Sequence, residues 1–383
     1  MDAERPRGIT RFFDDVQDPR MDRTRDHKLE DILMIGLVAI LGGAEAWTQV
    51  ELFAKSKRAW FERWLELPNG IPSHDTFGRV FGLVDPDQLS QCFARWVNHL
   101  ASLMGVEAKT IAIDGKTVRG SADAAAGDPA LHLLGAWAHE SGLVLAQLAC
   151  DAKSNEITAI EDLIATLELY GCVVTVDALN TQTSVAEAIK ARGGDYVMAL
   201  KQNQRTLHDD AALMLAEAED EPARFTLDDY ATDDHAHGRV EHRHYATLAL
   251  DKHTWRITRD RWPGLKAIGG VVRQRTDKTT DQTTTTTVYY LMSQPMTAER
   301  FAAAVRGHWG IENAAHWVLD VTFDEDRCRC RKNHGHQNFA LMRRLAMNLL
   351  RANRDRTKLG MKAQRLKIGW DIDFLEDLLR HLN

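Results

Sequence analysis

The chain has 383 residues, of which 44% are hydrophobic and 27% charged, and its formal net charge is −7. This composition is typical of a globular protein with a sizeable core and argues against a disordered chain. The longest apolar stretch, residues 32–44, is shorter than the roughly 20 residues of a membrane helix. Two acids rather than basic residues precede it, which argues against a signal peptide. We therefore expect a cytoplasmic protein with no membrane partner.

The net negative charge hides a segregation of charges along the chain. Residues 327–367 contain thirteen Lys or Arg and a single acid, whereas residues 209–234 contain ten acids and one basic residue. A basic segment in an otherwise acidic protein is typical of a local phosphate-binding surface. A solvated helix face is the alternative. Five scattered cysteines do not indicate a disulfide framework, and Cys328-x-Cys330 lacks the second pair that would complete a zinc site.

Residues 1–105 are expected to form a helical domain. Leu29 to Trp47 is apolar with few breaks, and a turn precedes Ser73, which can cap a following helix. A helix, a turn and a short second helix are typical of a helix-turn-helix DNA reader. Packing alone explains the pattern equally well. The side chains that would read DNA are His74, Asp75, Thr76 and Arg79.

Between residues 108 and 201 the pattern alternates between strands and helices, which predicts a mixed sheet covered by helices. We expect strands at 109–116, 131–138, 142–150, 172–177 and 195–200 and helices at 156–169 and 182–192.

Residues 203–292 break this alternation. An acidic helix to about residue 221 is followed by β-like runs at 239–249, 267–275 and 285–292, which predict a β-rich insertion. Helix is expected again at 297–318 and from 336 to the end.

Asp114, Asp177 and Glu312 are the candidate metal-binding acids. Asp114 and Asp177 each end an apolar run, and open α/β sheets usually carry their sites at strand ends. Mg²⁺ binds through one or two carboxylates plus substrate phosphates, and paired metals clamp both oxygens of a phosphoryl displacement. The alternatives are ordinary turn residues, since Asp114-Gly115 is a turn dipeptide, and a common helix glutamate.

The helical segment around Glu312 has an unusual face. Trp309, Glu312, His316 and Asp320 recur at spacings of three and four, which on an α-helix places them on one face. A core stripe would not need this mixture of an aromatic ring and polar groups. An exposed amphipathic helix with one stray Trp is the alternative.

Several basic residues near the acids are candidate phosphate contacts. Lys116 follows Asp114, and Gly115-Lys116-Thr117 is not a nucleotide P-loop, because Thr110 stands where its first glycine is required. Arg239 and Arg243 lie in a polar cluster, residues 237–243, at the start of an expected strand. A solvated edge strand explains this cluster equally well.

The ordered motifs 113–116, 176–182 and 308–321, supported by 237–241, 325–326 and 338–343, resemble those of DDE-type insertion-sequence transposases of the H-repeat-associated protein group. The resemblance extends from about Phe12 to Leu379. It implies an α/β protein with an RNase H-like catalytic core, interrupted by a β-rich insertion. It also implies that Asp114, Asp177 and Glu312 bind two Mg²⁺ ions, for which Mn²⁺ can substitute.

On this reading the domains are an N-terminal helical domain (1–105), a candidate DNA reader, the first part of the core (106–202), an acidic helix with the β-rich insertion (203–292), the second part of the core (293–350) and a basic helical tail (351–383). The expected reaction is hydrolysis at the element's ends followed by attack of the freed 3′-OH on target DNA. The partners are double-stranded DNA and, at synapsis, a second copy, in the bacterial nucleoid. The expected DNA contacts are Lys116, Arg239, Arg243, Arg306, Trp309, His316, Arg327, Arg329, Arg331 and Lys332.

Two other functions share these features. A host-adopted nuclease would have the same acids but no joining step, and a silent DNA-binding protein would have no catalysis. The presence of all three acids argues against the silent protein.

Overall fold

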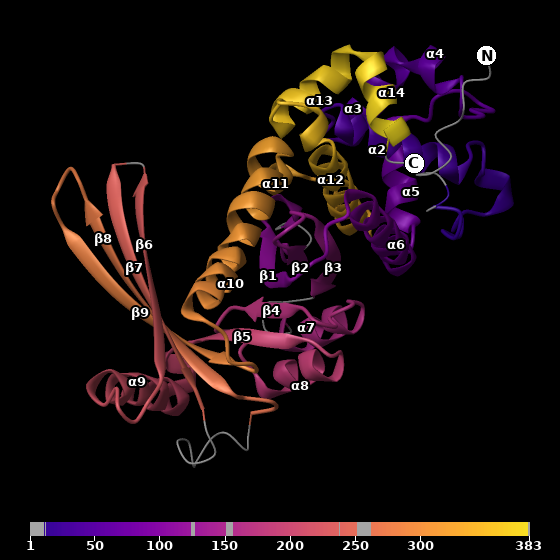
Figure 1. The fold of residues 1–383 in the computed structure, drawn as a ribbon. Coiled ribbons are helices and arrows are strands. Elements are labelled where there is room, and N and C mark those ends of the chain that lie inside the picture. The colour runs from indigo at the N-terminus through magenta and orange to yellow at the C-terminus, as the bar shows by residue number, and fades with distance from the viewer. Residues whose placement is uncertain are drawn as a thin grey trace. The chain divides into compact units, whose positions relative to one another are not determined.

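The computed structural model describes residue 11 and residues 13–123, 127–150, 156–236, 238–250 and 262–381. The chain, whose ribbon is shown in Figure 1, divides into two compact units and passes from one to the other four times, after residues 107, 114, 153 and 311. Unit 1 comprises Met1–Glu107, Gly115–Lys153 and Glu312–Asn383, and unit 2 comprises Ala108–Asp114 and Ser154–Ile311.

The nine described strands are hydrogen bonded in the order β3-β2-β1-β4-β5-β9-β8-β7-β6. β1, β4 and β5 run parallel, whereas β2 pairs with β3, and β5, β9, β8, β7 and β6 pair in this order, in antiparallel fashion, so the sheet is mixed. The expected α/β class is confirmed. The strands are β1 (Thr110–Val118), β2 (Leu131–Ala138), β3 (Val144–Cys150), β4 (Val173–Val176), β5 (Asp195–Leu200), β6 (Leu227–Ala236), β7 (Arg239–Ala249), β8 (Ala267–Asp277) and β9 (Thr283–Met292).

Unit 1 is mainly helical, as the sequence predicts for its N-terminal part. α2 is buried on every side from Ile32 to Leu41, which explains why its sequence is apolar without a polar stripe. The Ser73 hydroxyl accepts a hydrogen bond from the Thr76 amide, which confirms the predicted cap. The helices of unit 1 are α2 (Leu29–Leu41), α3 (Trp47–Ser56), α4 (Arg58–Phe61), α5 (His74–Leu83), α6 (Pro86–Met104), α11 (Trp317–Thr322), α12 (Gly335–Ala352), α13 (Met361–Trp370) and α14 (Ile372–His381).

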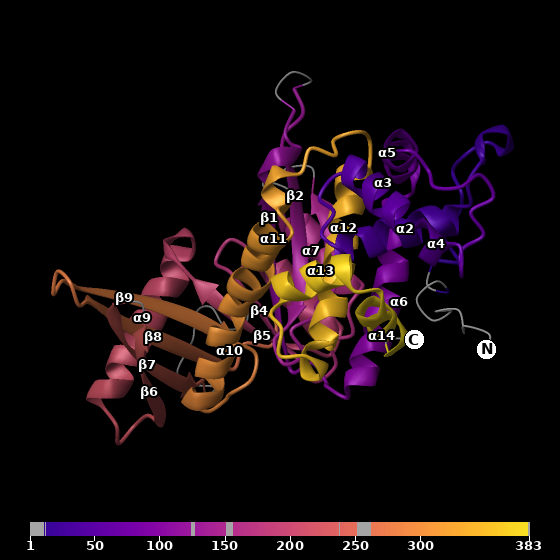
Figure 2. The same cartoon turned by 90° about the horizontal axis from the view of Figure 1, so that it is seen from above.

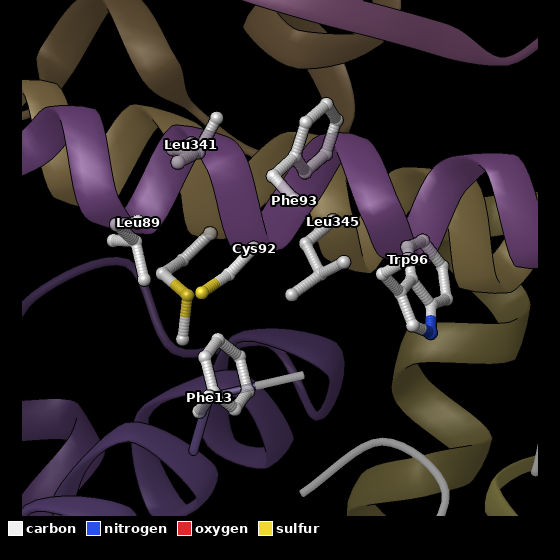
Figure 3. Close-up of a pocket in the computed structure, with 8 residues that line it drawn as sticks. Phe13, Leu89, Cys92, Phe93, Trp96, Leu341 and Leu345 are labelled. Atoms are coloured by element: carbon white, nitrogen blue, oxygen red, sulfur yellow. The ribbon is translucent and has the colours of Figure 1, made fainter. Parts of the chain in front are cut away.

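α12 is the central helix of unit 1 and packs against α2, α5 and α6 (Figure 2). A small cavity between α6 and α12 has an entirely apolar lining, including Phe93 and Trp96 from α6 and Leu341 and Leu345 from α12 (Figure 3). It is a packing gap in the core, since hydrophobic side chains make up its lining, with the buried thiol of Cys92 and the thioether of Met342 among them. Among the described residues, no helix combines the length and apolar character needed to span a bilayer.

In unit 2, helices cover both faces of the antiparallel sheet formed by β6 to β9. α9 and α10 lie on opposite faces of this sheet (Figure 1). Neighbouring residues of a strand point to opposite sides, and two neighbouring glycines of β8 each face one of these helices. A Cβ on Gly269 would lie 2.6 Å from the Phe301 ring of α10, and one on Gly270 would lie 3.0 Å from Leu215 of α9. The helices of this unit are α7 (Glu156–Ala165), α8 (Thr183–Ala191), α9 (Arg205–Asp220) and α10 (Ala298–Gly310).

β6 was not expected from the sequence. It contains four aspartates, and aspartate is depleted in strands. The strand forms because it is an edge strand whose acids meet a basic neighbour. Asp233 Oδ1 lies 2.7 Å from the His242 ring, and Asp234 accepts a hydrogen bond of 2.7 Å from Arg243. Charged residues on an edge strand also discourage pairing with other chains.

The helix expected at 297–318 is present, but it is not one regular α-helix. α10 ends at Gly310, a π-helix follows from Ile311 to His316, and α11 then begins. π-helical hydrogen bonds join residues five apart, so the spacing of three and four that predicted a common face does not hold across this segment. No disulfide joins any of the five cysteines, all of which lie in the described residues.

Candidate functional site

Two of the three predicted acids emerge side by side in unit 2. Ile113 of β1 is the parallel register partner of Val176 of β4. Asp114 and Asp177 follow these partners directly, and both are half-buried. Because neighbouring strands lie about 4.8 Å apart, the two side chains are next to each other, although β1 continues beyond Asp114 to Val118 and only Asp177 follows a strand end. The structure therefore brings Asp114 and Asp177 together, as the two apolar runs predicted.

The turn after β4 fixes the Asp177 carboxylate. Its Oδ1 accepts hydrogen bonds from the Asn180 backbone amide at 3.0 Å and from Asn180 Nδ2 at 3.1 Å. Asn180 Nδ2 also donates to the buried Glu156 at 2.8 Å. Sequence reasoning did not identify Asn180 or Glu156 as site residues, although Asn180 lies within the motif at 176–182.

His308 of α10 is buried against β4, the strand that precedes Asp177. Its Nδ1 lies 3.0 Å from the Thr175 hydroxyl, two residues before Asp177 on β4. Burial lowers the pKa of His308, against the opposing effect of the Asp177 charge, so the ring is neutral at physiological pH. His308 is the first residue of the motif 308–321, but no role for it follows from the sequence alone. α10 is thereby fixed against β4 one helical turn before Glu312.

Glu312 is exposed and is the first residue of the last segment of unit 1. Across the described parts of the chain, no group of three or more His, Cys, Asp and Glu side chains is arranged to hold a metal ion. The convergence of Glu312 with the aspartate pair therefore stays a prediction. Of its expected neighbours, Trp309 is 49% exposed and His316 is half-buried.

Lys116 does not lie on the surface, contrary to what a phosphate contact requires. It is 7% exposed, and its Nζ lies 2.7 Å from Asp320 Oδ1, 3.2 Å from Asp326 Oδ1 and 3.7 Å from Glu325 Oε2. Glu325 is fully buried and also binds Arg344 at 2.7 Å. Three carboxylates already neutralise and surround the ammonium, so the structure gives Lys116 an internal role.

Two of the three predicted cations in the insertion and on α10 form ion pairs with acids. Arg243 and Arg306 both contact Asp234, at 2.7 Å and 3.0 Å, and Arg243 also pairs with Glu241. Arg239 is exposed at the start of β7. Phosphate binding by these three arginines stays a prediction, and for Arg243 and Arg306 it would compete with existing ion pairs.

Fewer cations of the basic segment, residues 327–367, lie on the protein surface than its sequence suggests. Arg343, Arg344 and Arg365 are buried, and the Arg351 guanidinium donates to the carbonyls of Gly142 and Ala314. These arginines satisfy interior acids and carbonyls, which a count of charges along the chain cannot reveal. The exposed cations of the segment's first part are Arg327, Arg329 and Lys332, with Arg331 beside them donating to the Gly120 carbonyl at 3.1 Å.

Comparison with known proteins identifies the family of the chain. The family model described as the transposase DDE domain matches residues 106–349, and the DDE_Tnp_1-associated model matches residues 10–97. The chain belongs to the DDE-domain transposase family. Together the two models cover most of the chain, so the resemblance inferred from the motifs is confirmed.

Named relatives of this family member come from Escherichia coli. It is 34% identical to putative transposase YncI of strain O157:H7, over 95% of this chain and 92% of the relative. It is also 34% identical to the H repeat-associated putative transposase YhhI of strain K12, over 95% of each chain. A cryo-EM structure of a piggyBac transposase synaptic complex with hairpin DNA aligns with 98% of this chain and 81% of its own, at a TM-score of 0.48 and 8% identity.

Proposed function

We propose that this transposase hydrolyses the phosphodiester at the ends of its DNA element and joins the freed 3′-OH to target DNA. Family membership supports transposition in general. The observation that carries the specific proposal is the register of β1 and β4, which sets Asp114 and Asp177 side by side. Two adjacent carboxylates, one within β1 and one directly after β4, suit a site for metal-dependent phosphate chemistry.

We propose Glu312 as the third acid of this site. The hydrogen bond between His308 and Thr175 fixes α10 against the strand that ends at Asp177. Glu312 follows His308 by four residues on the continuing helix, which advances the chain by about one turn. The π-helix that begins at Ile311 also supports a specialised role, because such segments occur frequently at functional sites.

The donor set suits hard divalent cations, since all three proposed ligands are carboxylates. Two Mg²⁺ ions, or Mn²⁺ in their place, would polarise the phosphodiester and activate the attacking oxygen when bound. The chain's own residues orient the ligands. Asn180 holds one oxygen of Asp177, and the neutral His308 supports β4 from below without adding positive charge beside the acids.

We also propose that β1 to β5 form the RNase H-like core. β1, β2 and β3 follow one another along the chain, and β4 and β5 come next, each preceded by a helix. β6 to β9 then lie between β5 and α10 in the sequence. This agrees with the insertion that the resemblance implies. The proposed domain boundaries remain those of the sequence, with the helical domain ending at residue 105 and the basic tail starting at 351.

The DNA backbone is proposed to contact exposed cations, chiefly Arg327, Arg329 and Lys332. Trp309 exposes half of its surface, which suits stacking on a displaced base. Joining two element ends requires two active sites, so we propose a homodimer at synapsis, acting in the nucleoid.

The test uses a supercoiled plasmid that carries the element's own ends, with Mg²⁺ present. Asp114→Asn and Asp177→Asn are expected to reduce cleavage by at least about 100-fold, because each removes a charge that holds the metals. DNA binding should change little in both variants. Glu187→Gln, on the exposed face of α8, is the matched control and should retain cleavage.

Retained cleavage in Asp114→Asn would overturn the metal assignment. The same reaction separates the two enzymatic alternatives, because a transposase converts the cleaved ends into joined products in target DNA. A host-adopted nuclease would release cut DNA and give no joined product.

A further inference from the structure

A cluster of opposite charges lies in unit 1, with Lys116, Glu325 and Arg344 buried and two further acids partly exposed. The Lys116 ammonium is enclosed by Asp320, Glu325 and Asp326 at 2.7 to 3.7 Å, and Arg344 neutralises Glu325 from the other side. Burying charges is costly unless each is paired with good geometry. A cluster of this kind therefore needs a reason beyond stability alone.

The two sides of the cluster are each close in sequence to a proposed metal ligand. Lys116 stands two residues after Asp114 on β1, and side chains two apart on a strand point to the same side. Asp320 lies on α11, eight residues after Glu312, and Glu325 and Asp326 follow in the next turn. The ion pairs of the cluster thus connect β1 to the segment that continues from Glu312.

Backbone contacts beside the cluster also hold β1 and this segment together. The short 3₁₀ helix Arg119–Ser121 follows β1 and packs on a second one, Glu325–Arg327. The Arg119 amide donates to Asp326 Oδ1 at 3.3 Å. A Cβ at Gly120 would lie 2.6 Å from the Asp326 carbonyl oxygen, so only glycine permits this approach.

We propose that Lys116 is a positioning residue, which sets the spacing between β1 and the helical segment beginning at Glu312 so that their acids bind metal together. This inference rests on the proposed function. A compact ammonium has three donors, which matches three carboxylates. Without it, Asp320, Glu325 and Asp326 repel one another, and the segment from Glu312 shifts relative to β1.

The experiment compares Lys116→Met, Lys116→Arg and the charge-balanced Lys116→Met/Asp320→Asn. Three readouts are made for each variant: Mn²⁺ affinity of the protein without DNA by calorimetry, cleavage against Mg²⁺ concentration, and DNA affinity. Lys116→Met is expected to weaken Mn²⁺ binding and raise the half-saturating Mg²⁺ concentration by roughly 10–100-fold, as loss of a supporting residue around metal ligands does. DNA affinity should stay within about twofold, since Lys116 is buried.

The double variant separates positioning from mere folding. It should recover much of the thermal stability, because it removes one unpaired acid, yet keep the weak metal binding. Lys116→Arg should retain more metal affinity than Lys116→Met. Lys278→Met, in the exposed turn between β8 and β9, is the matched control and should leave all three readouts unchanged.

If Lys116→Met is folded and binds Mn²⁺ with wild-type affinity, the positioning role is wrong. If it does not fold, Asp326→Asn, whose acid is partly exposed, replaces it, and unchanged metal affinity again contradicts the proposal. Failure of the proposed function is distinguishable, because the wild type would then show no metal-dependent cleavage, or Asp114→Asn would retain it, whatever the Lys116 variants do.

Discussion

At the scale of single residues, buried amides join distant parts of unit 1. Asn348 of α12 donates to the Val144 carbonyl at 2.8 Å and accepts from the Val144 amide at 3.0 Å, so it completes the hydrogen bonding at the start of β3. Asn338 donates in the same way to the carbonyls of Phe81 and Val84. Each amide is fully buried, and so are the groups that it satisfies.

Asn348→Ala is therefore expected to reduce the free energy of unfolding by about 2–4 kcal/mol, because it leaves a buried backbone donor and acceptor unpaired. Urea denaturation followed by circular dichroism measures the change. Ser102→Ala, on the exposed side of α6, should stay within about 0.5 kcal/mol of wild type. A loss no larger than that of the control would show that water replaces the amide.

The predicted site residues show what sequence reveals about single positions. Asp114 and Asp177 were identifiable because each ends an apolar run, and strand ends are where such sites lie. The roles of His308 and Lys116 were not identifiable. Their partners lie more than 100 residues away, so only the folded chain shows that one supports β4 and that the other is buried among acids.

At the scale of elements, the join between β5 and β9 depends on one small polar group. Asp195 accepts hydrogen bonds of 2.7 Å from Lys190 and from the Ser293 hydroxyl, and Ser293 in turn accepts from the Tyr196 amide. Burial raises the pKa of Asp195, but these hydrogen bonds and the Lys190 charge outweigh it and hold the pKa below 3.8.

A carboxylate with a lowered pKa stabilises the fold above its unfolded pKa and loses this effect as the pH falls through the folded value. Asp195→Asn should therefore cost about 1–2 kcal/mol at pH 7. The difference from wild type should shrink once the pH falls below about 3.8. Denaturation curves from pH 7 to pH 2.5 measure this, and a difference independent of pH would contradict the role of the charge.

Most elements were predictable because their hydrophobic periods are clear. β2, β5 and β7 have the predicted bounds, since their apolar residues follow strand patterns. β6 was missed because its aspartates oppose strand formation, and only pairing with β7 compensates for them. The π-helix was missed because its sequence fits an α-helix equally well.

At the scale of the whole molecule, charge along the sequence and charge on the surface differ. Several arginines of the basic segment are interior, so fewer cations remain for DNA than the sequence suggests. Arg329→Ala/Lys332→Ala should reduce the slope of log affinity against log salt concentration by about 2, because each phosphate contact contributes about 0.9.

The slope is measured by fluorescence anisotropy with element-end DNA at several salt concentrations. Arg224→Ala, an exposed arginine in the acidic region, is the control and should leave the slope unchanged. If the double variant keeps the wild-type slope, both residues leave the proposed set of phosphate contacts.

The arrangement of the two units along the sequence has a consequence for degenerate copies of the gene. Unit 1 includes both ends of the chain, whereas unit 2 lies entirely within residues 108–311. Truncation from either terminus therefore damages unit 1 first, and a premature stop codon before position 312 removes Glu312 while sparing both aspartates. Such shortened products should consequently fail to cleave DNA, because they lack the third proposed metal-binding acid.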